Sequence, residues 1–226
     1  EESGRYYADV PALWMLLTQS RCVISVQDLF FKRVSALVRV MGIERFRNPE
    51  TVRRFVLIAS KAIGVRHGVN SVSGPVLYCT SESLLPVRLY PCRLITKEDI
   101  PALKEAGLYD SSLDYSIEQG TCFAAFDQDQ PVSLAGTYPV PHMAELVAEI
   151  AVPGTIATHR RLGYGRTALS STTEAVLNQN RVPVYITSDQ NMASQDTAKA
   201  VGYRLYGWQF RIRLVRPDID TQRRAF

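Results

Sequence analysis

The sequence has little that would suit a metal-binding, secreted or membrane-spanning protein. Its four cysteines are far apart in the chain and form no C-x-x-C pair. This argues against a zinc site and against a scaffold of dense disulfides. No run approaches about 18 consecutive apolar residues, so we expect no membrane span and no membrane partner. The cysteine usage instead indicates reduced core thiols in a cytoplasmic protein without a metal site.

An excess of charge of one sign is also lacking. The 26 Lys and Arg against 22 Asp and Glu leave a formal net charge of +4, which is too small to indicate a nucleic-acid partner. At 226 residues the chain is long enough for one large domain or two small ones. The sequence opens with Glu-Glu-Ser-Gly rather than Met, so a targeting segment ahead of it stays an open option.

Residues 1–86 are predicted to be a mainly helical region. Apolar residues recur at helical spacing over 30–41, and a second amphipathic helix is expected over 48–63, where an Asn-Pro pair suits a helix start. A short strand is expected over 74–80. The region carries no recognisable chemistry, and its apolar faces predict core or inter-domain packing.

Residues 87–226 change to a mixed rhythm of strands and helices. Strands alternate with helices after an opening hairpin, which predicts an α/β sheet of mixed direction. The expected strands are 87–95, 121–126, 132–138, 143–155, 182–187 and 203–214, and the expected helices begin near 96, 164 and 193.

A short glycine motif stands between the strand at 143–155 and the helix behind it, reading Arg160-Arg161-Leu162-Gly163-Tyr164-Gly165. Glycines that open a helix let backbone N–H groups approach a ligand, often a phosphate. A Walker loop is excluded, because no G-x-x-x-x-G-K spacing exists. A nicotinamide fingerprint lacks its third glycine, since residue 168 is Ala, although Asp189 keeps a weak form of that option open.

The spacing Arg160-x-x-Gly163-x-Gly165 resembles the Q/R-x-x-G-x-G/A pyrophosphate loop of the GNAT superfamily of acyl-CoA-dependent N-acetyltransferases. Asn191, 26 residues after Gly165, begins a helix that Gly202-Tyr203 closes, which is similar to a later helix of that superfamily. The resemblance covers about residues 87–214. It implies a GNAT-type mixed, mostly antiparallel central sheet flanked by helices, in a domain of residues 87–226 that follows the mainly helical region.

The resemblance implies acetyl-CoA as the acyl donor. Backbone N–H groups at the start of the helix would hold its pyrophosphate with help from the helix dipole. The strand before the loop is expected to bulge or splay and bind the pantetheine arm, with a simple strand-end turn as the alternative. The predicted cofactor-binding residues are Pro153, Gly154, Thr155, Arg160, Arg161, Leu162, Gly163, Tyr164, Gly165, Arg166 and Asn191.

A general base is expected on the same strand, because an amine with a pKa of about 10.4 must lose a proton before it attacks. Strand alternation would place Glu145 and Glu149 on one face, about 13 Å apart at ~3.3 Å per residue. Glu149 lies eleven residues before Arg160, where several relatives have their base. Glu149 is therefore the predicted catalytic base and Glu145 the reserve, with an exposed or salt-bridged glutamate as the alternative. His142 and His159 are weaker candidates.

The leaving thiolate poses a separate question. Many relatives carry a tyrosine seven residues after the asparagine, and this chain has Ala198 there. The proton would then come from water or from a tyrosine near in sequence, Tyr203 or Tyr206, or no protein acid would be needed.

The sequence thus predicts an N-acetyltransferase that transfers an acetyl group from acetyl-CoA to the primary amine of an unidentified acceptor by direct attack. The acceptor is an amine-bearing small molecule or protein. A non-catalytic coenzyme A-binding regulatory or scaffold domain is the alternative. The N-terminal region could cover the acceptor side, form a homodimer, or be a decayed second copy of the fold.

Overall fold

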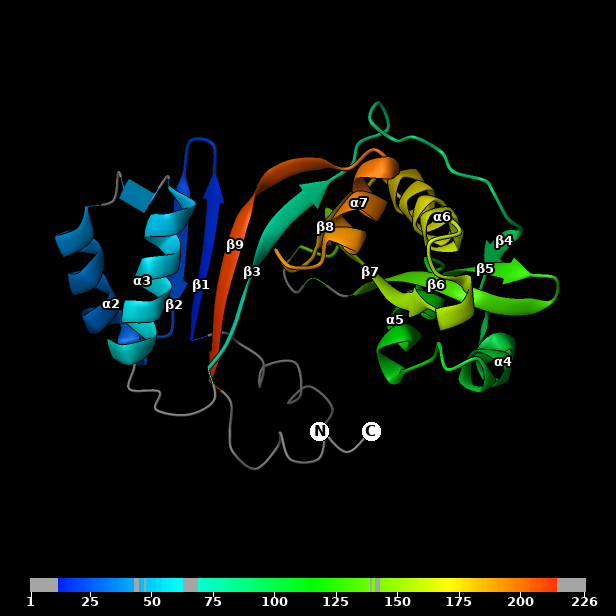
Figure 1. The fold of residues 1–226 in the computed structure, drawn as a ribbon, viewed down its shortest axis with the longest axis horizontal. Coiled ribbons are helices and arrows are strands. Elements are labelled where there is room, and N and C mark those ends of the chain that lie inside the picture. Colours follow the sequence, from blue (N-terminus) through cyan, green and yellow to red (C-terminus); the bar gives the residue numbers. More distant parts are fainter. Residues whose placement is uncertain are drawn as a thin grey trace. The chain divides into compact units, whose positions relative to one another are not determined.

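The computed structural model describes residues 12–42, 45–46, 48–62, 69–138, 140 and 143–214 (Figure 1). The chain divides into two compact units, one made of residues 1–75 with 207–226 and the other of residues 76–206. Strands β3 (Val69–Tyr78) and β9 (Arg204–Leu214) each run from one unit into the other.

The first unit packs two helices against strands in the order β2-β1-β9-β3. Side chains alternate along β1, where Leu13, Met15 and Leu17 are buried and share a core with Phe30 and Phe55 of the helices. β1 pairs antiparallel with both β2 and β9. Besides β3 and β9, the elements of this unit are β1 (Leu13–Thr18), β2 (Cys22–Val26), α2 (Asp28–Met41) and α3 (Pro49–Ala62).

The prediction of a mainly helical N-terminal region is wrong. The two predicted helices exist as α2 and α3, but β1 and β2 form a hairpin ahead of them. β1 reads Leu-Trp-Met-Leu-Leu-Thr, so apolar residues fill both faces and conceal the period of two that marks a strand. Its partner β9 lies far along the chain, and a local pattern carries no sign of that pairing.

The second unit is a mixed sheet in the strand order β3-β8-β7-β6-β5-β4. Its described strand pairs are antiparallel except β7 with β8, which is parallel. The predicted mixed, mostly antiparallel sheet flanked by helices is confirmed. Its elements are β4 (Cys92–Leu94), η2 (Lys97–Asp99), α4 (Ile100–Glu105), η3 (Ser111–Leu113), α5 (Asp114–Glu118), β5 (Phe123–Asp127), β6 (Gln130–Tyr138), β7 (Val147–Thr155), η4 (Ala157–His159), α6 (Tyr164–Asn178), β8 (Val182–Ile186) and α7 (Met192–Ala200).

Helices cover both faces of this sheet (Figure 1). On one face, Ala148 and Ile150 of β7 pack in a buried cluster with Leu169 of α6 and Ala198 of α7. On the other face, Leu103 of α4 packs with Leu134 of β6 and residues of α5 and β5. Alternate β7 residues therefore point toward α6 and α7, which determines the face on which the intervening residues lie.

The last residues of β3 pair with β8. The register runs from Val76 opposite Ile186 to Tyr78 opposite Val184, in antiparallel sense. Leu77 and Cys79 are 2% and 0% exposed and join the cluster beneath α6 and α7. β3 therefore contributes to the core of the second unit as well as to its sheet.

Two predicted strands are shorter than expected. The one expected over 87–95 is reduced to β4, because the Val87 N–H donates to the Ser170 hydroxyl of α6, at 2.9 Å, in place of a strand partner. The one expected over 143–155 begins only at Val147, since residues 143–146 form a turn.

Candidate functional site

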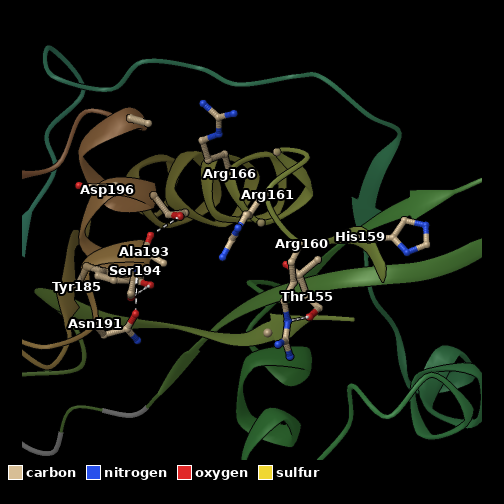
Figure 2. A pocket seen from close by; sticks show the side chains of 15 residues that line it. Thr155, His159, Arg160, Arg161, Arg166, Tyr185, Asn191, Ala193, Ser194 and Asp196 are labelled. Carbon is tan, nitrogen blue, oxygen red and sulfur yellow. Dashed lines mark hydrogen bonds between the residues drawn. The ribbon is translucent and has the colours of Figure 1, made fainter. Parts of the chain in front are cut away.

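A cleft of about 780 Å³ lies between the β7–α6 connection and α7 (Figure 2). This volume falls within the range of roughly 300–1,000 Å³ that is usual for ligand pockets. One wall comes from the segment that ends β7 and begins α6, and the other from α7 and the end of β8. The cleft is thus built where the ends of strands β7 and β8 meet helices α6 and α7.

β7 contains a bulge before it enters this wall. Leu134 of β6 lies opposite Gly154, and Gly136 lies opposite Ala151, so two steps along β6 match three along β7. The extra residue falls at 152–153, beside Gly154, whose φ of 153° is rare for residues with a side chain. The bulge expected at Pro153-Gly154 is therefore present.

Beyond the bulge, β7 continues alongside the cleft. Its parallel register with β8 runs from Val147 opposite Val182 to Ile150 opposite Tyr185, whereas β7 itself extends to Thr155. Gly154 and Thr155 both line the cleft. The two strands therefore part at the level of Tyr185.

Backbone conformation brings the start of α6 to the cleft. Gly163 is the N-cap residue, with a φ of 104° in the left-handed region. A Cβ atom at Gly165 would lie only 3.2 Å from the Thr155 hydroxyl, so the first helical turn passes close to β7. The first N–H groups of a helix lack carbonyl partners within it, and here they begin at a residue that lines the cleft. This is the arrangement that binds anions.

Positive side chains in the cleft strengthen its preference for anions. Arg160, Arg161 and Arg166 all line the cleft, together with the acidic Asp196 of α7. The Arg160 Nε donates a hydrogen bond to the Thr155 carbonyl at 3.0 Å, which fixes the start of the loop. Figure 2 shows the Arg161 side chain extending from the loop into the space before α7. The wall therefore carries a net positive charge next to a helix N-terminus.

The facing wall is one side of α7. Asn191 is the N-cap residue, and its side-chain oxygen accepts a hydrogen bond from the Ser194 N–H at 3.1 Å. Ala193, Thr197 and Ala200 also line the cleft. Their spacing of three and four residues is that of a single helix face. From the sequence, Asn191 was the single residue of this helix predicted to bind a ligand. The same spacing of three and four residues could have identified Ala193, Thr197 and Ala200.

Tyr185 is a cleft residue that sequence reasoning missed. Its side chain is 5% exposed, and its hydroxyl lies 2.8 Å from the Ser194 hydroxyl. Burial raises the pKa of Tyr185, and the hydrogen bond with Ser194 opposes that rise. The apolar strand around it, Val-Pro-Val-Tyr-Ile, predicts a core residue, which is why the pattern concealed it.

Two predicted binding residues support the loop from outside the cleft wall. The Leu162 carbonyl accepts a hydrogen bond from the Tyr90 hydroxyl at 2.8 Å. The Tyr164 ring stacks on the Tyr90 ring, with the ring centroids 3.6 Å apart. Neither Leu162 nor Tyr164 is among the described residues that line the cleft.

The two predicted glutamates do not share a strand face. Glu149 lies in β7 opposite Tyr138 on one side and Val184 on the other, and is half-buried. Its neighbours in sequence point toward α6 and α7, so Glu149 points to the opposite face of the sheet. Glu145 is exposed in the turn before β7, and the expectation that it lies on the same strand is wrong.

Of the two candidate histidines, His159 lies among the described residues. His159 lines the cleft at its edge, where one ring nitrogen lies 2.9 Å from the Asp127 carboxylate and the other 2.9 Å from the Thr158 hydroxyl. These contacts tie the β7–α6 connection to the β5–β6 turn. His142 lies outside the described residues.

Within the described ranges, no group of three or more His, Cys, Asp and Glu side chains could hold a metal ion. The helices in those ranges include none with the length and apolar character needed to cross a membrane. All four cysteines are free thiols.

Comparison with known proteins identifies what this architecture is similar to. A family model described as the acetyltransferase (GNAT) family matches residues 90–203. No curated protein gives a significant match.

Solved structures share the fold at low sequence identity. An acetyltransferase from the GNAT family from Colwellia psychrerythraea is 11% identical, over 84% of this chain and 76% of that one, with a TM-score of 0.54. A GCN5-related N-acetyltransferase from Kribbella flavida is 18% identical, over 76% of each chain, with a TM-score of 0.52.

Proposed function

Since the chain belongs to the GNAT acetyltransferase family, we propose that it transfers an acetyl group from acetyl-CoA to the primary amine of a small molecule or protein. The observation that carries this proposal is the cleft beside the bulged strand β7, where a helix N-terminus and three arginines meet. Such a wall favours a ligand that carries phosphates.

The residues present fit coenzyme A. Gly163 and Gly165 expose the first-turn N–H groups of α6 to a pyrophosphate, and Arg161 and Arg166 supply positive charge beside it. Asn191 faces this loop across the cleft and adds an amide group to the wall, while its oxygen also caps α7. The backbone of β7 near Gly154 would bind the pantetheine arm, because it has passed its last β8 partner.

Glu149 would act as the base. When bound, acetyl-CoA supplies an activated acetyl thioester. Glu149 points to the sheet face opposite α6 and α7, so an amine that approaches from that face would meet the carboxylate directly or through one water. Glu149 takes the proton that the ammonium nitrogen must lose before it attacks. The C–N bond then forms as the C–S bond breaks, and the second proton that the nitrogen loses goes to solvent.

A second candidate is a coenzyme A-binding domain without turnover. The observation that favours it is Ala198, which is fully buried and stands where the resemblance leads one to expect a tyrosine. This candidate keeps the same cleft and the same ligand, and differs only in the fate of the thioester.

Release of free thiol from acetyl-CoA distinguishes the two. We would measure it with a chromogenic thiol reagent in the presence of lysine methyl ester, spermidine, phenethylamine and a peptide with a free N-terminal alanine. Turnover with any of these amines above the rate without amine supports acetyl transfer. Tight binding of acetyl-CoA without amine-dependent thiol release would instead favour the non-catalytic candidate.

A further inference from the structure

Tyr185 is the most buried of the described hydroxyl-bearing residues that line the cleft, at 5% exposed, and the mechanism proposed above assigns it no role. Building on the proposed acetyl transfer, we propose that Tyr185 is a catalytic residue that donates a hydrogen bond to the sulfur of coenzyme A as the thioester breaks. Ser194 is the positioning residue that holds the phenol in place. The step leaves a thiolate, whose developing negative charge needs a donor.

Tyr185 is the tyrosine that lines the cleft among the described residues. The other two tyrosines near the end of α7 have different surroundings. Tyr203 is buried with its hydroxyl 2.8 Å from the Thr173 hydroxyl. Thr173 donates its own hydrogen to the Leu169 carbonyl at 2.7 Å, so the Tyr203 hydrogen must be the one directed to Thr173. The phenol of Tyr203 is therefore committed to the core.

Tyr206 is excluded on a different ground. Tyr206 is 53% exposed, and its ring makes an edge contact with the ring of Tyr78, with the ring centroids 6.2 Å apart. It is not among the described residues that line the cleft.

The position of Tyr185 suits the reactive end of the ligand. The β7–β8 register ends at Ile150 opposite Tyr185, and β7 bulges directly afterwards. Figure 2 shows Tyr185 beside Asn191 and Ser194, across the cleft from Arg160 and Thr155. A long ligand with its phosphates at the α6 loop must place its other end away from that loop. Tyr185 lies where the strands part and such an end can enter.

The small side chain at position 198 explains how a phenol from a strand reaches this place. A helical side chain points back over the preceding turn, so a large residue at 198 would extend toward the turn that contains Ser194. Ala198 is fully buried and belongs to the same apolar cluster as Tyr185. From this direction we infer that a longer side chain at 198 would reach toward Ser194, which the Tyr185 hydroxyl contacts.

Either hydroxyl of the Tyr185–Ser194 pair can be the donor in their hydrogen bond. In the arrangement that the proposal uses, the Ser194 hydroxyl donates to the phenol oxygen, which leaves the Tyr185 O–H available to a ligand in the cleft. Because burial raises the pKa of Tyr185, the residue is a neutral phenol near pH 7 and can donate. In the step, the electron pair of the C–S bond passes to sulfur, which accepts this hydrogen bond and is then protonated from solvent. The ammonium proton has already passed to Glu149, and the second proton that the nitrogen loses as the amide forms goes to solvent.

The first test needs no acceptor. A donor to the sulfur stabilises the thiolate and lowers the pKa of the thiol of bound coenzyme A. We would follow thiolate absorbance against pH for coenzyme A bound to the protein, with S-methyl coenzyme A as the blank. We expect the pKa of this thiol to rise by about one unit in Tyr185→Phe, by less in Ser194→Ala, and not at all in the matched control Tyr203→Phe. Equal values in Tyr185→Phe and the unaltered protein would overturn the proposal.

The second test moves the hydroxyl. With an amine that the unaltered protein acetylates, Tyr185→Phe should lower kcat about tenfold or more while the Kd for acetyl-CoA stays the same. The double substitution Tyr185→Leu with Ala198→Tyr should recover most of that loss, since the phenol then comes from the helix. If Tyr185→Phe leaves thiol release unchanged, only this role of Tyr185 is ruled out. If the unaltered protein binds coenzyme A and acetylates no amine, the proposed function itself is ruled out.

Discussion

At the scale of single residues, the sheet separates the groups that bind from the group that we assign to proton removal. Ala148 and Ile150 point toward α6 and α7, and Glu149 between them points to the other face. The loop of residues 160–165 follows the end of the same strand. One strand therefore carries both the backbone that we propose to bind the ligand and a carboxylate on the opposite face, from which we propose that the acceptor approaches.

This arrangement predicts a specific effect of removing the carboxylate. Glu149→Gln keeps the shape of the side chain and removes its basicity, so kcat for amine acetylation should fall by about 10²- to 10⁴-fold. The Kd for acetyl-CoA should not change. Glu145→Gln is the matched control, because Glu145 lies in an exposed turn and should leave the rate unaltered. If Glu145→Gln lowers kcat while Glu149→Gln does not, the roles that we give to the two glutamates are reversed.

A site residue could be predicted from the sequence where the backbone at its position favours a particular residue type. Gly163 has a left-handed φ and Gly165 lies close to Thr155. Both positions favour glycine, which is visible in the sequence. Tyr185 leaves no such mark, because a tyrosine in an apolar strand reads as core. Its contact with Ser194 joins two elements, and the sequence alone does not show how they pack.

At the scale of elements, the helical segment that follows β4 depends on one carboxylate. Asp99 accepts two hydrogen bonds from the Arg93 guanidinium, at 2.7 and 2.9 Å, and one from the Thr96 N–H at 2.9 Å. The guanidinium of Arg93 and the backbone N–H lower the pKa of Asp99 to about 2. Because the folded pKa lies below the ordinary value, this stabilisation is present above about pH 4 and is lost as the pH falls toward 2.

Asp99→Asn should therefore destabilise the protein in a pH-dependent way. We expect a loss of about 1 kcal/mol in the free energy of unfolding at pH 7, a figure reduced for solvent screening of a partly exposed pair. The difference from the unaltered protein should shrink as denaturant unfolding is repeated at lower pH. A difference that is the same at pH 7 and near pH 2 would contradict this assignment.

Element boundaries followed contacts that the sequence does not show. Helix α6 was predicted from residue 164, where the structure begins it, because a glycine N-cap marks its start. The strand expected from Val87 was wrong at its beginning, since the hydroxyl of Ser170, 83 residues away, binds the Val87 backbone. Such partners become visible only once α6 is packed on the sheet.

At the scale of the whole molecule, the chain does not divide at a single point. The sequence suggested a boundary between residues 86 and 87, whereas the compact unit begins at Val76. The difference includes the end of β3, which pairs with β8, and the buried Leu77 and Cys79. We propose that a stable second unit requires this strand.

Two fragments test that proposal. A fragment of residues 87–206 lacks the β8 partner and leaves one edge of the sheet and its apolar cluster uncovered, so it should aggregate or melt at least about 10 °C below a fragment of residues 76–206. Thermal unfolding and size-exclusion chromatography of both would measure this. Equal melting temperatures and equal solubility would show that β3 is dispensable to the unit.

The central claim is that the cleft between the β7–α6 connection and α7 binds coenzyme A. Calorimetric titration of the full chain with acetyl-CoA tests it most directly, with NAD as the competing phosphate ligand. The account predicts one site per chain for acetyl-CoA, a Kd that weakens about three- to tenfold in Arg161→Ala and further with added salt, and no heat with NAD. Absence of binding to acetyl-CoA, or binding of NAD in its place, would contradict it.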